Sequence, residues 1–248
     1  MELVFKNAKT FKSIIDSISV LVDQGEFLVT SEGLSLRAAD QAMIAMVDFS
    51  MPKSAFKDYK VSGDTKIGLD LDAFSKILSR ARSEDELSLS LSEDNATLDV
   101  GFKGKAKRHF TLPLLDTSGA DLPTPKVEFD VQAKVTADIL QDGLKDAALF
   151  NSYVTFAAAD KAFRLQAKGT SGSLKFELSE KDPSLMELKV KKSAQASFSL
   201  DYLQDITKGA EKEATILVEF KSNAPLLVSY AIEEAKLKYF VAPRAEAD

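Results

Sequence analysis

The segment LDAFSKILSRA at residues 71–81 decides the fold, because the chain nearly repeats it as LDYLQDITKGA at residues 200–210. Leucine, aspartate, isoleucine and alanine recur at matching positions when residue 71 is set on residue 200. In both segments apolar residues return every three or four positions, which is typical of an amphipathic helix. Asp72 and Asp201 stand where a capping or first-turn carboxylate favours the start of a helix. The recurrence predicts a duplicated domain.

The same offset matches further elements in the two halves. Residues 32–38 fall on 161–167, and both have alternating apolar positions that predict strands. Amphipathic helices are predicted at about 9–22 and 136–149. Two strands follow in each half, and between them the register slips by one: Leu87, Leu89, Leu91, Leu98, Val100 and Phe102 match Ile216, Val218, Phe220, Leu226, Val228 and Tyr230. Each half therefore predicts an α+β domain with helices on one face of antiparallel sheet.

A polar segment containing two prolines separates the halves. Residues 116–125 read DTSGADLPTP, a composition that favours an extended connector. We therefore expect an N-terminal domain at 1–115, a connector at 116–126 and a C-terminal domain at 127–248.

Composition narrows the class of protein. The chain has 248 residues, of which 45% are hydrophobic and 28% charged, as in a folded globular protein. It has no cysteine, which excludes disulfides and thiolate metal sites. Its first residues lack a long apolar stretch, and no stretch approaches the roughly 18 apolar residues of a membrane span. We expect an intracellular protein that contacts no membrane.

Several motifs carry a resemblance to a known family. They are GLSLRAAD at 33–40, LDLDAFSKIL at 69–78, SEDN at 92–95, APL at 224–226 and LKYFVAPR at 237–244. In their order and spacing the chain resembles the proliferating cell nuclear antigen (PCNA) family in its archaeal form, over essentially its whole length. The resemblance implies a non-catalytic DNA sliding clamp that confers processivity on the replicative polymerase.

The resemblance also implies an assembly. Three chains, identical or paralogous, would form a ring of six domains, with the helices lining the hole and the antiparallel sheets outside. Strands at about 107–112 and 173–178 would join the subunits head to tail, which leaves no exposed sheet edge. The implied interface residues are Lys107, Arg108, His109, Phe110, Leu112, Leu174, Lys175, Phe176, Glu177 and Leu178. The alternative is two ordinary edge strands.

The net charge of −6 alone argues against a nucleic-acid partner. Exposed charges are screened over roughly 8 Å at physiological salt, however, so the local sign on a ring lining would decide binding. Helix-face and helix-end cations would then meet the phosphates of double-stranded DNA without reading its sequence. The expected DNA-facing residues are Lys9, Lys12, Lys76, Arg80, Arg82, Lys145, Lys208 and Lys212. The alternative for each is an ordinary solvated helix face.

Clamps of this family also dock short peptides that carry the PCNA-interacting motif, and the resemblance extends that groove to this chain. Its residues would be Ala39, Met43, Ile44, Met46, Leu122, Pro123, Pro225, Phe240, Val241, Ala242 and Arg244. The alternative is that Ile44, Met46 and Val241 are core residues. Ala39 and Ala120 are small where relatives carry larger apolar residues, which makes a shallower groove or a different peptide preference possible. Met43 replaces a histidine typical of eukaryotic clamps.

No residues suggest catalysis. The single histidine, His109, follows two basic residues on a strand, and no Gly-x-Ser-x-Gly or phosphate-binding loop occurs. We expect no enzyme activity, cofactor or metal. The expected partners are further copies of the chain, DNA polymerase, a clamp loader, flap endonuclease and DNA ligase. The expected location is the cytoplasm at the nucleoid, or the nucleus in a eukaryote. The competing hypothesis is a tandem-domain enzyme or ligand carrier with a site between the repeats.

Overall fold

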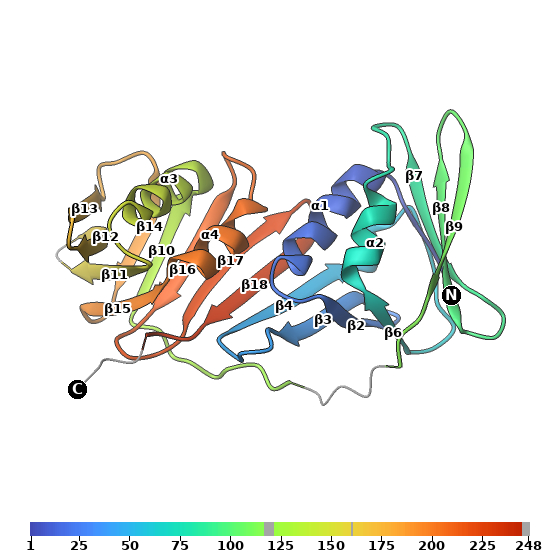
Figure 1. Ribbon diagram of the computed structural model, residues 1–248, viewed down its shortest axis with the longest axis horizontal. Coiled ribbons are helices and arrows are strands. Elements are labelled where there is room, and N and C mark those ends of the chain that lie inside the picture. Colours follow the sequence, from blue (N-terminus) through green and yellow to red (C-terminus); the bar gives the residue numbers. More distant parts are fainter. Residues whose placement is uncertain (117–121, 160, 245–248) are drawn as a thin grey trace. The chain divides into compact units, whose positions relative to one another are not determined.

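The computed structural model describes residues 1–116, 122–159 and 161–244, and the chain forms two compact units (Figure 1). Unit 1 comprises Met1–Gln41, Val47–Pro123 and Ile232–Leu237. Unit 2 comprises Ala42–Met46, Thr124–Ala231 and Lys238–Asp248. The expected connector falls partly on residues 117–121, including Ala120, which lie outside the described residues.

Unit 1 contains two helices and two groups of strands. The helices are α1 (Ala8–Ser19) and α2 (Leu71–Leu78), and a short 3-10 helix spans Lys53–Ala55. One sheet has the order β5-β1-β7-β8-β9, and the other runs β4-β3-β2-β6 with Ala235–Leu237 of β18 beside β4. The strands are β1 (Glu2–Phe5), β2 (Gln24–Val29), β3 (Gly33–Ala39), β4 (Ala45–Pro52), β5 (Asp58–Lys60), β6 (Thr65–Asp70), β7 (Glu86–Leu91), β8 (Thr97–Lys103) and β9 (Lys107–Pro113).

Unit 2 repeats this plan. Its helices are α3 (Ala137–Ala148) and α4 (Leu200–Lys208). One sheet runs β14-β10-β16-β17-β18 and the other β13-β12-β11-β15. The strands are β10 (Val131–Thr136), β11 (Tyr153–Ala159), β12 (Ala162–Gly169), β13 (Gly172–Ser179), β14 (Leu185–Val190), β15 (Ala194–Ser199), β16 (Thr215–Phe220), β17 (Leu226–Ile232) and β18 (Ala235–Val241).

The predicted duplication is confirmed down to single backbone hydrogen bonds. In unit 1 the Leu71 amide donates to the Asp23 carbonyl, and at the equivalent place in unit 2 the Leu200 amide donates to the Ser152 carbonyl, both at 2.9 Å. The register slip is also confirmed, because Leu89 pairs with Val100 on β7 and β8 whereas Val218 pairs with Val228 on β16 and β17. The sequence offset between the two units is therefore shorter by one position after the slip.

In each unit the two helices pack side by side and cover sheet (Figure 1). Their apolar stripes are buried: α1 contributes Phe11, Ile14, Ile15 and Ile18, and α2 contributes Leu71, Phe74 and Leu78. In unit 2 the centre of the fully buried Phe156 ring lies 5.8, 5.9 and 6.2 Å from the ring centres of Phe163, Phe198 and Phe220. Truncating such a side chain to alanine costs about 3–5 kcal/mol of unfolding free energy.

The second helix confirms the expected first-turn carboxylate at Asp72, but it ends earlier than predicted. Its N-cap is Asp70, whose side chain accepts from the Ala73 amide at 2.8 Å, and Asp72 lies in the first turn. Asp70 takes that position because its backbone is extended while its carboxylate reaches the amide of the third helical residue. The helix also ends at Leu78, so Arg80 lies beyond it rather than on the helix face. No helix in the described part of the chain is long and apolar enough to cross a membrane.

Candidate functional site

Four cations on the helical side of unit 1 have exposed side chains and no ion pair within the described residues. They are Lys9 on α1, Lys76 on α2, and Arg80 and Arg82 after α2. Because none of them is neutralised by a neighbouring carboxylate, their charge is available to an external anion. We call these four residues the unit 1 cations.

Lys12, also expected to face DNA, is differently placed. Its ammonium pairs with Asp16 one turn further along α1, and both side chains are only partly exposed. The other Asp16 carboxylate oxygen accepts from the Ser75 hydroxyl at 2.6 Å, which joins α1 to α2. Lys12 is therefore paired within α1, with the carboxylate that also joins the two helices.

A buried ion pair supports the loop that carries Arg80 and Arg82. Asp85 is 1% exposed and pairs with Arg108 of β9, whose guanidinium also donates to the Arg80 carbonyl at 2.7 Å. The second donor to Asp85 Oδ2 is the Arg82 amide, at 2.7 Å. The guanidinium lies 5.0 Å from the centre of the Phe102 ring. Arg108 was expected to face a neighbouring subunit, but its side chain is occupied within its own unit.

The helical side of unit 2 has the opposite sign. Asp138, Asp142 and Asp146 are spaced four residues apart along α3, so they follow one exposed face. Lys145 pairs with Asp142 at 2.9 Å. The carbonyl of Lys212 accepts from the Asp138 amide at 3.0 Å, which sets this lysine beside the acidic helix.

Helix α4 of unit 2 adds two exposed carboxylates, Asp201 and Asp205, and one exposed cation, Lys208. Of the three cations expected to face DNA from unit 2, two thus lie next to α3 carboxylates. The expected DNA-facing set is therefore concentrated in unit 1.

The two strands expected to join subunits each end a sheet in the described structure: β9 closes the order of one sheet and β13 that of another. Along β9 the side chains of Lys107 and His109 are exposed, whereas Leu112 is buried in unit 1. Leu178 of β13 is likewise buried. Both leucines therefore belong to the core, and only their backbone could take part in strand pairing.

The outer residues of β13 are partly committed within unit 2. Glu177 forms an ion pair with Arg164 at 2.5 Å, and the hydrogen bond from this arginine holds the pKa of the Glu177 carboxyl below its usual value. Leu174 and Phe176 are half-buried, and Lys175 is exposed. Apolar and charged side chains thus alternate along this edge.

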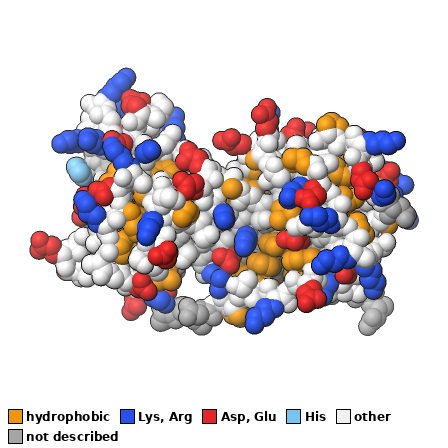
Figure 2. All heavy atoms as spheres, turned by 180° about the vertical axis from the view of Figure 1, so that it is seen from behind, with side chains coloured by type: hydrophobic (Ala, Val, Ile, Leu, Met, Phe, Trp, Pro, Cys, Tyr) orange, Lys and Arg blue, Asp and Glu red, His pale blue; other side chains and the backbone are white. Residues whose placement is uncertain are grey.

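The face opposite to that of Figure 1 carries Lys and Arg intermingled with Asp and Glu (Figure 2).

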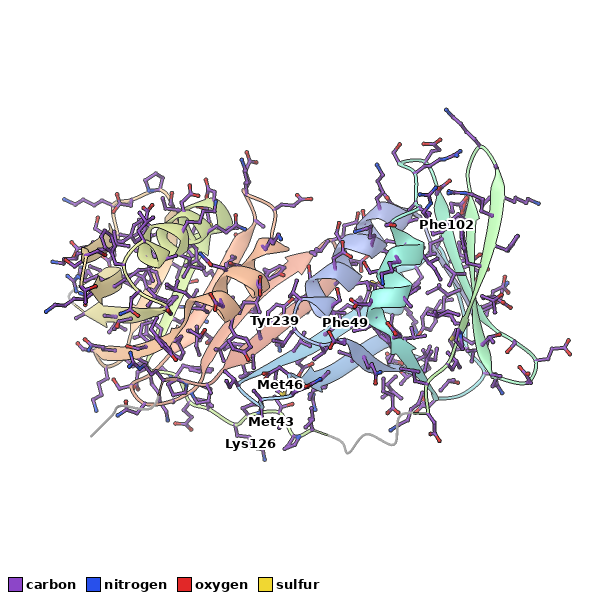
Figure 3. The ribbon with its side chains drawn as sticks, in the orientation of Figure 1. Met43, Met46, Phe49, Phe102, Lys126 and Tyr239 are labelled. Atoms are coloured by element: carbon purple, nitrogen blue, oxygen red, sulfur yellow. The ribbon has the colours of Figure 1, made fainter. Side chains whose placement is uncertain are left out.

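Two unit 2 members of the expected peptide groove, Met43 and Ile44, are exposed. Met43 has a left-handed backbone (φ 56°) and a 68% exposed residue surface, and its neighbour Ile44 is 38% exposed. The Ile44 carbonyl accepts from the Ala242 amide at 2.8 Å, which binds this loop to the C-terminal segment. Arg244 stacks on the Tyr153 ring at 4.4 Å. Figure 3 labels Met43 and Met46 on this segment of unit 2.

Other groove candidates lie deeper. Met46, Phe240 and Val241 are buried, so their side chains are core, whereas Pro225 and Ala242 are half-buried. In unit 1, Ala39 and Leu122 are half-buried and Pro123 is exposed.

Arg37 was not predicted as a functional residue, although it lies within the GLSLRAAD motif. Its guanidinium donates to the Leu122 carbonyl at 2.9 Å, beside the expected groove. Nothing in the sequence pattern marks that contact, because the two residues lie 85 positions apart.

A duplicated α+β domain, with two helices on sheet and an edge strand in each half, defines the class of two-domain sliding clamps. Family models match both halves: "Proliferating cell nuclear antigen, N-terminal domain" over residues 1–117 and "Proliferating cell nuclear antigen, C-terminal domain" over residues 124–245. The chain therefore belongs to the proliferating cell nuclear antigen family.

Individual relatives agree over their full length. The DNA polymerase sliding clamp of Thermofilum pendens is 39% identical over 99% of this chain and 100% of its own. The crystal structure of PCNA from Thermococcus kodakaraensis has a TM-score of 0.94 and 30% identity, covering 98% of this chain and 99% of its own. The structure titled "C-terminal region of FEN-1 bound to A. fulgidus PCNA" has a TM-score of 0.90 and 27% identity, covering 100% and 99%.

Proposed function

We propose that this chain is a DNA sliding clamp that encircles duplex DNA as a ring of three identical or paralogous subunits, tethers the replicative polymerase and recruits further enzymes at the nucleoid. The observation that carries the proposal is the full-length match to a relative named DNA polymerase sliding clamp, together with the duplicated domain. The chain itself performs no chemistry in this role, since holding DNA topologically requires no catalytic group.

The repeat supports a specific mode of ring closure. The offset that relates the two units places β9 on β18, and it places β4 on a stretch that overlaps β13. Within unit 1, the β18 residues Ala235–Leu237 lie beside β4. The equivalent pair, β9 with β13, is therefore predicted to form between copies. Such a contact is head to tail. It forms a closed ring when the rotation that relates one subunit to the next is a whole fraction of 360°.

The unit 1 cations support binding to the phosphate backbone. Three copies would bring twelve such side chains (four in each copy) around the duplex. Contacts of this kind release counterions, depend steeply on salt and carry no sequence information, so every register along the DNA is nearly equal in energy. These properties are what a sliding protein needs.

The Met43–Ile44 surface supports peptide docking. An exposed methionine beside exposed isoleucine adapts to varied apolar anchors. The relative from A. fulgidus binds the C-terminal region of FEN-1, and we extend this mode to flap endonuclease, polymerase, clamp loader and ligase partners here.

Mass photometry of the purified chain tests the assembly. The proposal predicts a species of three times the 27.0 kDa chain mass, at nanomolar concentration or on adding a paralogous subunit. A chain that stays monomeric under both conditions and saturably binds a small molecule would instead favour the tandem-domain ligand carrier.

A further inference from the structure

Arg37 joins three parts of unit 1 through one side chain. Its guanidinium Nη1 donates to the Leu122 carbonyl at 2.9 Å, while Nη2 and Nε donate to Asp48 Oδ2 at 3.0 and 3.3 Å. Arg37 lies on β3 and Asp48 on β4, so neighbouring strands supply both members of the ion pair. The Arg37 side chain is 37% exposed and that of Asp48 21%.

The ion pair with Asp48 orients the Arg37 guanidinium toward the Leu122 carbonyl. A guanidinium is planar and always charged, so a carboxylate that binds one side of it fixes where the remaining N–H groups point. Leu122 precedes Pro123, and the proline ring restricts the preceding residue to extended backbone. The backbone conformation of Leu122 is therefore restricted, and Arg37 meets its carbonyl with a donor that Asp48 orients.

The segment that begins at Leu122 has few other restraints of regular structure. Residues 122–129 contain neither helix nor strand, and Pro123 and Pro125 have no amide hydrogen to donate. A side chain that binds the carbonyl at the start of this segment thus limits the directions in which the following residues can leave the sheet of unit 1.

We propose that Arg37 is a positioning residue: it holds the segment that starts at Leu122 in the arrangement that accepts a docking peptide. The inference rests on the proposed docking function, because Leu122 and Pro123 belong to the expected groove. A segment ordered before binding loses less conformational entropy when the partner arrives, so the peptide binds more tightly. Asp48 acts through Arg37 and is the second member of the device.

The first test measures binding of a synthetic peptide with the sequence of the A. fulgidus FEN-1 C-terminal region, by fluorescence anisotropy. Arg37→Ala should weaken binding about 3- to 10-fold, the effect of losing one charge-assisted hydrogen bond at a partly exposed site. Arg37→Lys should have a peptide affinity between those of the wild type and Arg37→Ala, since a lysine ammonium lacks the planar group that reaches both acceptors. Asp48→Asn should cause a smaller loss than Arg37→Ala. The matched control is Lys66→Ala, which breaks a 2.7 Å surface pair with Glu26 on neighbouring strands of the same unit and should leave binding unchanged.

A second test needs no peptide. Lys126 is exposed, so trypsin can cleave after it, and Arg37→Ala should speed this cleavage at least about 3-fold by freeing the segment, whereas Lys66→Ala should not. Unchanged cleavage and unchanged peptide affinity in Arg37→Ala would each overturn the positioning role. If the wild-type chain fails to bind the peptide, the docking function is what fails, and the cleavage rates decide on Arg37 separately.

Discussion

The two units share a backbone plan but differ in the charge of their helical sides. In unit 1 the Ala8 amide donates to the Asp85 carbonyl, and in unit 2 the Ala137 amide donates to the Ala214 carbonyl, both at 2.9 Å. The side chains at those positions have diverged: Asp85 anchors a buried ion pair, whereas Ala214 cannot. The counterpart of Arg108 is Lys236, which is exposed. Duplication has thus preserved the hydrogen-bonded frame, while only one copy has a braced, cationic loop.

We expect this difference in charge to give the two units unequal shares in DNA binding. The unit 1 cations are exposed and unpaired within the described residues, and two of them are carried by the braced loop. In unit 2, α3 has an exposed row of carboxylates. A polyanion would therefore be attracted mainly by unit 1 and held away from α3 of unit 2.

The largest expected effect comes from removing the brace. Arg108→Ala leaves the 1% exposed Asp85 carboxylate without its cation, and we expect a loss of about 3 kcal/mol in unfolding free energy, measured by chemical denaturation. Lys236→Ala, the matched change at the equivalent position of the repeat on β18, should cost less than about 0.5 kcal/mol. Equal losses in the two variants would show that the brace contributes nothing particular to unit 1.

Reversing the unit 1 charges should have the next largest effect. We expect the triple variant Lys76→Glu, Arg80→Glu, Arg82→Glu to lose at least about 100-fold in retention on DNA at low salt, since a trimer would exchange nine cations for nine anions. Surface plasmon resonance on end-blocked duplex measures this, with native mass recorded in parallel to confirm assembly. If the variant assembles and retains DNA normally, these unit 1 cations do not contribute to DNA binding.

Reversing unit 2 cations tests the other side of the comparison. Lys145→Glu with Lys208→Glu should weaken DNA retention by less than about 5-fold, because Lys145 is already paired with Asp142. The same resonance assay applies. A loss as large as that of the unit 1 variant would contradict the unequal division.

The smallest effect should come from neutralising the acidic row. Asp142→Asn with Asp146→Asn should raise DNA retention about 2- to 3-fold and leave the native mass unchanged, because a repulsive charge is removed without disturbing a buried group. A fall in native mass would assign these carboxylates to subunit contacts instead.

The repeated order of elements, the helices, the edge strands and the one-residue slip were predictable because they follow from apolar periodicity and self-similarity. The Asp85–Arg108 pair was not, since its partners lie 23 positions apart on a loop and a strand and no periodicity connects them. Apolar periodicity also could not separate buried Met46 and Val241 from exposed Met43 and Ile44, because all four are apolar and their burial depends on contacts with distant parts of the chain. The end of α2 at Leu78 was missed because Arg80 and Ala81 continue the helical spacing beyond the last helical turn.

Topological linkage to DNA is tested most directly by loading the chain on nicked circular duplex with a clamp loader and ATP, isolating the complex by gel filtration, and cutting the circle with a restriction enzyme. A ring that encloses the duplex will remain on the circle and leave once it is linearised. If the protein stays equally well on linear DNA with free ends, or never remains on the circle, the chain does not act as a sliding clamp.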